Sequence, residues 1–355
     1  MPERLKGLEN FSYETINIET VAKKAFAKRY LLGVKYCFKA RKVFKAQQNF
    51  DVMMVQSCPW APFAITFAKN CVKTPVIYNS QDMFPGASIA NGAMKQKWMQ
   101  QIFYMFQKVA YRRANHISVI SEDMKQKVIE QGVPAAKITV IPDWYDDKSV
   151  REIPWEENLF VKKYDLKKDC FYVQFAGTMG MNFDYKMVLQ VAEKLKQEKK
   201  IVFQMIGQGS QKDDFVHAAQ EKKLDNIVFL PLEPQEMVPH VYSACSACLI
   251  PLPRGVIGNS VPSKAGLLMA CHRVIVTSAD AGSDYNDMFK REQIGMAFDC
   301  DDSDGVAKGI LKLRDEPEYC SRLADNAQKY GKAVYARTVN TKLYEDLYRR
   351  IGGKA

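Results

Sequence analysis

A lysine beside a serine and a proline is the clearest candidate for chemistry in this sequence. Pro262, Ser263 and Lys264 follow a loop of small and polar residues and precede the apolar stretch 265–270. Proline and serine suit the first turn of a helix, because proline loses no needed hydrogen bond there and serine can satisfy free amides. Free amides and the ammonium of Lys264 would together attract a diphosphate. The same stretch equally fits an ordinary loop, helix and strand with a surface lysine.

Other candidate residues follow short apolar runs of strand length. Gly177 and Gly180 follow one run rich in valine and phenylalanine, and Gly207 and Gly209 follow another that also contains isoleucine. Gln81 and Asp82 follow the run 75–79. Glycine loops let backbone amides approach phosphates.

Strands and helices that alternate along the chain must position these residues. The first half predicts strands at 51–56, 75–79, 116–121 and 137–142, and the second half at 171–176, 201–206, 226–231, 247–251 and 274–277. Amphipathic stretches of helical spacing lie between them, a pattern typical of parallel α/β sheets. A polar, proline-containing stretch at 143–168 separates the halves. We therefore expect domains at 1–158 and 159–335, with a helix over 336–355 packing back towards the first domain.

Parallel α/β domains bind ligands at the carboxyl ends of their strands. Gln81 and Asp82 would lie at that edge in the first domain, and Gly177 and Lys264 in the second. The sequence therefore predicts that these residues face one another across a cleft.

Composition narrows the classes of partner and compartment. The chain of 355 residues is 47% hydrophobic, and it has neither an apolar run long enough to span a bilayer nor a signal peptide. Its nine cysteines have no metal-binding spacing, and the close pair Cys245 and Cys248 fits small buried residues, so we expect no metal site and a reducing cytosol. The net charge of +11 indicates an anionic partner. No zinc finger or RNA-binding signature occurs, so nucleic acid is not expected.

A basic amphipathic helix is predicted over residues 19–47. Phe26, Tyr30, Val34 and Phe38 recur at intervals of four, and nine Lys or Arg residues occupy much of the remainder. Such a helix either packs its apolar side on the first domain or lies on an anionic membrane surface. Both interpretations stay open at this point.

Several motifs in the second half resemble those of family-4 glycosyltransferases with the GT-B fold, which build bacterial capsule, O-antigen and exopolysaccharide. The motifs are Phe175-Ala-Gly-Thr-Met-Gly180, Met205-Ile-Gly-Gln-Gly209, Asn226-Ile-Val-Phe-Leu-Pro231, Pro262-Ser-Lys264 with Met269-Ala270, and Gly282-Ser-Asp284. The first half resembles the family through Gln81-Asp82-Met-Phe-Pro85 and Val140-Ile-Pro142. Their order and spacing together carry the resemblance.

The resemblance implies two Rossmann-like domains around a cleft, and sugar transfer from a nucleotide diphosphate to a lipid-linked or saccharide acceptor. It implies retention of anomeric configuration, no metal and no cofactor, since the nucleotide sugar is a substrate. By position, Gln81, Asp82 and Asn259 would be catalytic. The donor would contact residues of the second domain: Gly177, Thr178, Gly207, Gly209, Leu230, Pro231, Ser263 and Lys264.

The sequence also departs from the family pattern. Many members carry two glutamates eight residues apart, and Asn259 and Leu267 occupy those positions. Members open with a strand and a glycine-rich loop, which this chain does not show, so we expect the first domain to lack its first βα unit. A non-catalytic partner subunit and, less favoured, a nucleotide-sugar 2-epimerase are the alternatives. We expect a cytoplasmic protein that associates with the inner face of the membrane.

Overall fold

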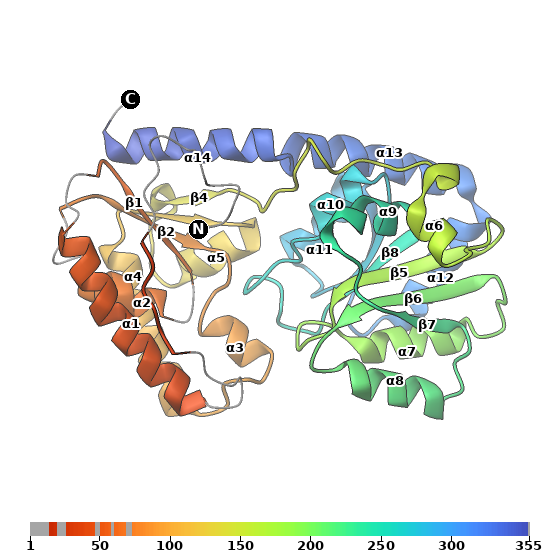
Figure 1. Cartoon of the computed structure of the whole chain (residues 1–355), viewed down its shortest axis with the longest axis horizontal. Helices are drawn as coiled ribbons and strands as arrows, with labels where there is room; N and C mark the ends of the chain where they lie inside the picture. Colours follow the sequence, from red (N-terminus) through yellow and green to blue (C-terminus); the bar gives the residue numbers. More distant parts are fainter. Residues whose placement is uncertain (1–13, 20–25, 47–49, 58–59, 69–72, 354–355) are drawn as a thin grey trace.

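The computed structural model describes residues 14–19, 26–46, 50–57, 60–68 and 73–353. These residues form two α/β domains with a long C-terminal helix pair above them (Figure 1). Every strand pairing inside the two sheets is parallel, as the alternation of strands and helices predicts. The predicted architecture is therefore confirmed.

The first domain holds a four-stranded sheet in the order β1-β2-β3-β4. Its strands are β1 (Met53–Gln56), β2 (Val76–Ser80), β3 (His116–Val119) and β4 (Ile138–Val140). Its helices are α1 (Phe26–Ala46), α2 (Ala61–Ala68), α3 (Gly86–Ala90), α4 (Lys97–Arg113) and α5 (Glu122–Glu130). All residues of β2 and β3 are buried, whereas β1 alternates between half-buried and exposed residues. In this sheet, each described strand therefore lies next to the strand that follows it in the sequence.

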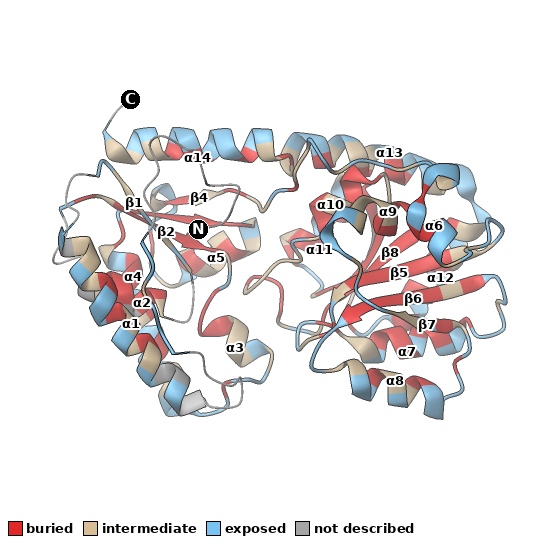
Figure 2. Cartoon of the chain, viewed as in Figure 1, coloured by how far each residue is buried: buried red, intermediate tan, exposed pale blue. Residues whose placement is uncertain are grey.

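The second domain holds a six-stranded sheet in the order β10-β9-β8-β5-β6-β7. Its strands are β5 (Phe171–Thr178), β6 (Ile201–Gln208), β7 (Ile227–Leu230), β8 (Ala247–Pro251), β9 (Val274–Ser278) and β10 (Gly295–Phe298). Its helices are α6 (Leu159–Lys163), α7 (Tyr185–Lys194), α8 (Lys212–Glu221), α9 (Val238–Ser243), α10 (Ala265–Ala270), α11 (Asp284–Arg291), α12 (Ser303–Asp315) and α13 (Pro317–Val334). The order reverses between β5 and β8, which creates the crevice where such sheets bind ligands. Buried apolar clusters cover both faces (Figure 2).

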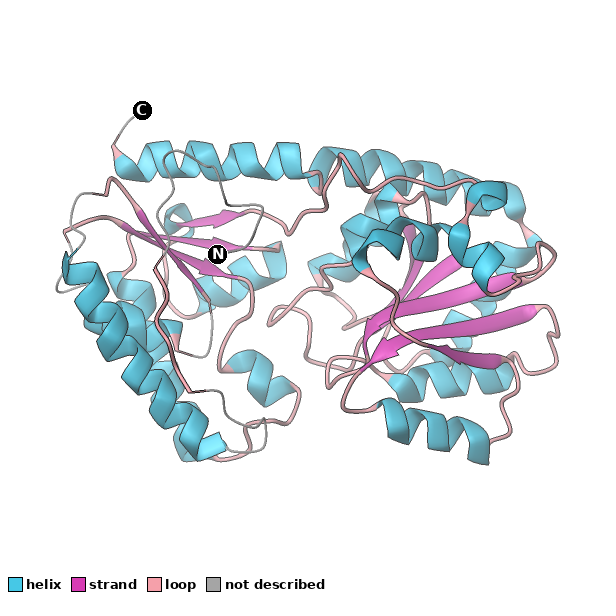
Figure 3. Cartoon of the chain, in the orientation of Figure 1, coloured by secondary structure: helices cyan, strands magenta, loops and turns pink. Residues whose placement is uncertain are grey.

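The strands of both sheets point their carboxyl ends at the space between the domains (Figure 3). The loops that follow β5, β8 and β9 in one domain therefore approach the loops that follow β2 and β4 in the other. This arrangement places Gln81 and Asp82 in one domain, and Gly177 and Lys264 in the other, near the sheet edges that face the space between the domains.

The helix α14 (Arg337–Gly352) returns to the first domain after α13. Tyr344 and Leu347 of α14 are buried against Ile77 and Ile141, and the Tyr344 hydroxyl donates to Asn79 Oδ1 at 3.0 Å. Two chain segments connect the domains, one through Tyr145 and the other through Ala336, and they pair with each other where they meet. Tyr145 donates its N–H to the Tyr335 carbonyl and accepts from the N–H of Arg337, each at 3.0 Å.

On the apolar side predicted for the first helix, the burial of Val34 and Phe38 is described, and neither is among the buried residues of the helix. Gly33, Cys37 and Ala40 are buried, while Phe38 is 51% exposed and Val34 is half-buried. A Cβ on Gly33 would overlap the ring of Trp60 at 2.1 Å, so close helix packing selects the small residues. Helical structure is described for 26–46, and residues 20–25 and 47 of the predicted span, with Lys23 and Lys24, lie outside the described residues.

None of the helices in the described part of the chain is both long enough and apolar enough to cross a membrane.

Candidate active site

Lys264 is the centre of the candidate site. Its ammonium donates to the carbonyl of Ala176 at 3.0 Å and lies 3.9 Å from the centre of the Phe175 ring. No carboxylate forms an ion pair with it among the described residues. Burial lowers the pKa of Lys264 to about 8, because the charged form loses its water. A buried cation that lacks a counter-ion is a favourable place for an anion.

The helix that follows Lys264 is shorter than the sequence predicts. α10 begins at Ala265, with Lys264 in the capping position and no side-chain cap. Ser263 is exposed and Pro262 is half-buried, and both precede the helix. The expectation that they form its first turn is therefore wrong. The positive group at this position is therefore the Lys264 ammonium itself, and its contacts with Phe175 and Ala176 fix its place.

A pocket of ≈ 630 Å³ surrounds this ammonium. It is lined by Gly177, Thr178, Ser263 and Lys264 of the predicted donor site, and also by Leu267. A Cβ on Gly177 would lie 2.4 Å from the Lys264 Nζ, so glycine leaves the space that the ammonium occupies. The structure thus brings together four of the predicted donor-binding residues.

The other predicted donor-binding residues do not line this pocket. Gly207 has φ +145, and a Cβ there would lie 1.9 Å from the Gly177 carbonyl oxygen. A Cβ on Gly209 would lie 2.2 Å from the Met179 carbonyl oxygen, so both glycines allow the ends of β5 and β6 to pack closely. Leu230 is half-buried at the end of β7, and Pro231 beyond it is exposed.

Asn259 lies where the two domains touch. Its backbone carbonyl accepts from the Met83 N–H at 2.8 Å, and its side-chain nitrogen donates to the Gly255 carbonyl at 2.9 Å. A Cβ on Gly86 would lie 2.3 Å from Asn259 Oδ1. The stretch after Asp82 therefore meets the second domain at Asn259.

Gln81 points into the first domain and lines a separate pocket with residues of α14. Its side chain accepts from Gln56 and donates to Asp143 Oδ1 at 3.1 Å, and its N–H donates to Ser57. Asp82 is exposed, and its N–H donates to Ser57 at 3.3 Å. The two residues thus lie at the carboxyl edge of the first sheet, and neither lines the pocket around Lys264.

Asp143 is a further acidic residue at this edge, directly after β4 and Pro142. Burial raises the pKa of its carboxyl, and the nearby charge of Asp82 adds to the shift. Sequence reasoning missed this residue. Its position after a buried strand, like that of Gln81, is the signal that could have found it.

Asp123 and Lys127 of α5 make direct contacts with the second domain. The two carboxylate oxygens of Asp123 accept from the N–H groups of Asp284 and Tyr285 at 2.8 and 2.9 Å. Lys127 donates to the Ile257 carbonyl at 3.4 Å. Asp123 therefore caps a helix of the other domain, which no local pattern in the sequence indicates.

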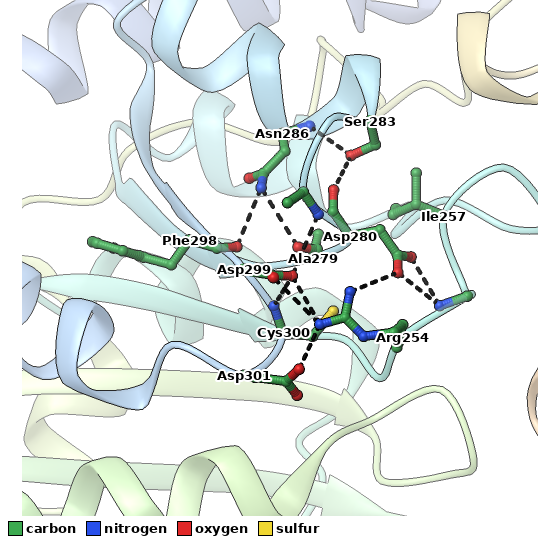
Figure 4. Close-up of polar contacts among 12 residues, drawn as sticks. Arg254, Ile257, Ala279, Asp280, Ser283, Asn286, Phe298, Asp299, Cys300 and Asp301 are labelled. Carbon is green, nitrogen blue, oxygen red and sulfur yellow. Dashed lines mark hydrogen bonds and ion pairs between the residues drawn. The ribbon is translucent and has the colours of Figure 1, made fainter.

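A charged cluster fixes the loop that carries Asn259 (Figure 4). Both carboxylate oxygens of Asp280 accept from the Gly255 N–H at 2.9 Å. Arg254 donates to Asp299 at 3.2 Å and to Asp301 at 2.5 Å. These contacts join the loops after β8, β9 and β10 at the edge of the sheet that faces the first domain.

No group of three His, Cys, Asp or Glu residues in the described ranges is arranged to hold a metal ion. Cys245 and Cys248 are buried with their sulfurs 3.3 Å apart, as small core residues, and burial holds the pKa of Cys248 well above its usual range.

Two family models match the chain, one in each domain. The model described as "Glycosyl transferase 4-like domain" matches residues 14–144, and "Glycosyl transferases group 1" matches residues 157–330. With the cleft and its basic pocket, these matches define a glycosyltransferase of the GT-B class. The chain belongs to the family-4 glycosyltransferases.

Two curated relatives are each 25% identical to this chain. One is the putative colanic acid biosynthesis glycosyl transferase WcaI of Escherichia coli K12, aligned over 56% of this chain and 49% of its own length. The other is the probable glycosyltransferase WbjE of Pseudomonas aeruginosa, aligned over 81% of this chain and 69% of its own length. The chain thus spans about half the length of the first relative and about two thirds of the second.

Solved structures share the fold at low sequence identity. Sucrose-phosphate synthase from Thermosynechococcus elongatus has a TM-score of 0.74 and 16% identity, over 95% of this chain and 81% of its own. HepE from Anabaena, solved in complex with UDP, has a TM-score of 0.71 and 15% identity, over 89% of this chain and 82% of its own. At these identities, the similarity shows that the two structures share the fold of this chain.

Proposed function

We propose that this protein transfers a sugar from a nucleoside diphosphate sugar to a saccharide or lipid-linked acceptor during cell-surface polysaccharide synthesis. The observation that carries the proposal is the Lys264 ammonium, which is partly buried, forms no ion pair with the residues that the structure describes, and lines a pocket at the carboxyl end of β5. Two curated relatives named for glycosyl transfer, and a fold neighbour solved with UDP, support it.

The residues of the pocket suit the leaving group of such a transfer. Negative charge grows on the diphosphate as the bond to the sugar breaks. A fixed ammonium at Lys264 then stabilises the transition state more than the ground state, which raises the rate. Gly177 leaves the space that this ammonium needs, since a Cβ there would lie 2.4 Å from Lys264 Nζ.

Calorimetric titration with UDP tests this function. Lys264→Met removes the charge and retains the packing on Phe175, so we expect UDP affinity to fall by at least tenfold, as loss of a charge-assisted hydrogen bond of about 1.5–3 kcal/mol predicts. Lys168→Met is the matched control, because Lys168 is an exposed lysine of the same domain that pairs with Glu156. Equal affinity of the wild-type protein and the Lys264 variant would remove Lys264 from the site.

We further propose that transfer retains the anomeric configuration and needs no metal ion, as in the enzymes that this chain resembles. Proton NMR of the first-formed product reports the configuration directly. Activity that survives chelation with EDTA supports metal independence, and activity restored only by a divalent cation contradicts it.

One observation favours a second candidate, a non-catalytic subunit that binds nucleotide. Leu267 lines the pocket where many family members carry a glutamate, and its side chain offers the ribose no hydrogen bond. Incubation with radiolabelled UDP-sugars and a membrane extract separates the two. UDP binding without transfer or hydrolysis of any donor would favour the second candidate.

We also propose that the protein acts at an anionic membrane surface on the cytoplasmic side. Leu31 and Phe38 of α1 are 72% and 51% exposed, and Trp98 and Met105 of α4 are 64% and 56% exposed. The exposed Lys35 and Lys42 lie along the same helix as Leu31 and Phe38. Apolar side chains beside basic ones are typical of helices that bind anionic lipid.

A further inference from the structure

The pocket around Lys264 offers a ligand one positive charge and no acid. Among the described residues that line it, Lys264 is the only charged side chain, and none is aspartate or glutamate. The polar side chains of the lining carry hydroxyls or amides, namely Asn91, Thr178, Asn182, Tyr242, Ser260 and Ser263. This lining suits a diphosphate, but it lacks a carboxylate, the group that accepts hydrogen bonds from two neighbouring hydroxyls at once.

A ribose ring presents such a pair of hydroxyls, on C2′ and C3′. Other parallel α/β folds that bind nucleotides meet the 2′-hydroxyl with an aspartate or glutamate. A hydroxyl that leaves water and finds no partner destabilises the complex, because it loses hydrogen bonds that nothing replaces. A pocket without an acid therefore suits a nucleotide that lacks one of the two hydroxyls.

Leu267 presents an apolar side chain close to Lys264. It lies three residues after Lys264, and residues three apart are neighbours on the surface of a helix. Leu267 is half-buried, lines the pocket and packs against the buried cluster of Tyr145, Ala270 and Ala336, which holds it in place. A ring joined to a diphosphate at Lys264 would thus lie against the Leu267 side chain.

That ring is the nucleoside and not the transferred sugar. The first domain contributes Asn91 to this pocket, and Ser260 adjoins Asn259, which touches the first domain. The transferred sugar has to lie at that end, because an acceptor reaches its reacting carbon from the space between the domains. Leu267 belongs to α10, which packs on β9 and α13 within the second domain. The ribose of the donor is therefore the ring beside Leu267.

We propose that the donor is the sugar ester of a 2′-deoxyribonucleoside diphosphate, with Leu267 against C2′ of the deoxyribose. The hydroxyls of Ser260 and Ser263 remain for the single hydroxyl on C3′. The proposal rests on the proposed glycosyl transfer and adds the class of nucleotide that the donor carries.

Calorimetric titration of the full chain with UDP and with 2′-deoxy-UDP tests the proposal, because the two ligands differ only in the 2′-hydroxyl. We expect 2′-deoxy-UDP to bind about fivefold more tightly. The preference is modest, since an apolar surface rejects an added hydroxyl far less strongly than a polar one rejects its loss.

A variant with a polar side chain of similar size shows whether Leu267 sets the preference. Leu267→Gln offers the 2′-hydroxyl a partner, so UDP should bind this variant at least as tightly as 2′-deoxy-UDP does. Leu159→Gln is the matched control, because Leu159 is a 52% exposed leucine of α6 in the same domain, and it should keep the wild-type preference.

Each result decides the question. Equal affinity of the wild-type protein for the two ligands, or tighter binding of UDP, overturns this inference and leaves the proposed glycosyl transfer standing. A preference for 2′-deoxy-UDP that Leu267→Gln retains overturns the role of Leu267. If Leu267→Gln does not fold by circular dichroism, the wild-type ratio decides alone. Binding of neither ligand overturns both this inference and the proposed donor site.

Discussion

Lys264 should make nucleotide binding depend on pH. Burial lowers the pKa of its ammonium to about 8, so the free protein carries the charge below that pH and loses it above. The phosphates of UDP are ionised throughout this range, since their second pKa is about 6. We expect the dissociation constant for UDP to be flat from pH 7 to about 7.5, and to rise by up to about tenfold per pH unit above 8.

Calorimetry across that pH range measures the effect. Lys264→Met should remove the dependence and leave a weak, constant affinity. A wild-type profile that stays flat to pH 9.5 would contradict the assignment of this lysine to the diphosphate.

Gly207 should be needed for the fold of the second domain. In Gly207→Ala the new Cβ would meet the Gly177 carbonyl at 1.9 Å, at a φ of +145 that alanine rarely adopts. We expect the free energy of unfolding in urea to fall by at least about 3 kcal/mol. Gly282→Ala is the matched control, because Gly282 has φ +76 with nothing within 4 Å, so only the backbone strain of about 1–2 kcal/mol applies. Equal losses in the two variants would show that the close approach does not matter.

At the scale of elements, α1 and α4 should carry the membrane association. Each basic residue near an anionic surface contributes about 1 kcal/mol, and salt screens this attraction. We expect co-sedimentation with vesicles that contain anionic lipid, less at high salt, and a clear loss when Lys35 and Lys42 become glutamine or Trp98 becomes serine.

Lys222→Gln and Lys200→Gln, exposed lysines of the second domain, serve as the control. Equal recovery with neutral and anionic vesicles would refute the membrane role.

The helices and strands could be predicted from the sequence, but the side that some of them bury could not. Alternating apolar runs indicate both sheets, since strands buried on two sides must be apolar. In the first helix, apolar residues spaced by four predict a buried side that includes Phe38. The structure instead buries the side with Gly33 and Cys37, because only small residues allow the contact with Trp60. Likewise Gln81 could be placed at a strand end, but its partner Asp143 comes from another strand far along the chain.

At the scale of the whole molecule, Asp123 should hold the domains together. Its carboxylate accepts two backbone N–H groups at the start of α11 in the other domain. Asp123→Ala leaves these amides without an acceptor, so we expect a larger and more variable radius of gyration in small-angle X-ray scattering. Asp304→Ala is the control, since Asp304 pairs with Lys194 within the second domain. An unchanged scattering curve for Asp123→Ala would show that other contacts suffice.

The paired crossing at Tyr145 and Ala336 restricts how the molecule can open. Two chain segments join the domains, and backbone hydrogen bonds tie them together at one place. Two domains that are joined at one short pairing can rotate about it as about a hinge. Sliding or separation of the domains would require these backbone hydrogen bonds to break. The crossing thus acts as the hinge, and α14 holds the first domain against it through the packing of Tyr344 and Leu347. Opening of the domains about this crossing would also have to break the contacts of Asp123 and Lys127 with the second domain.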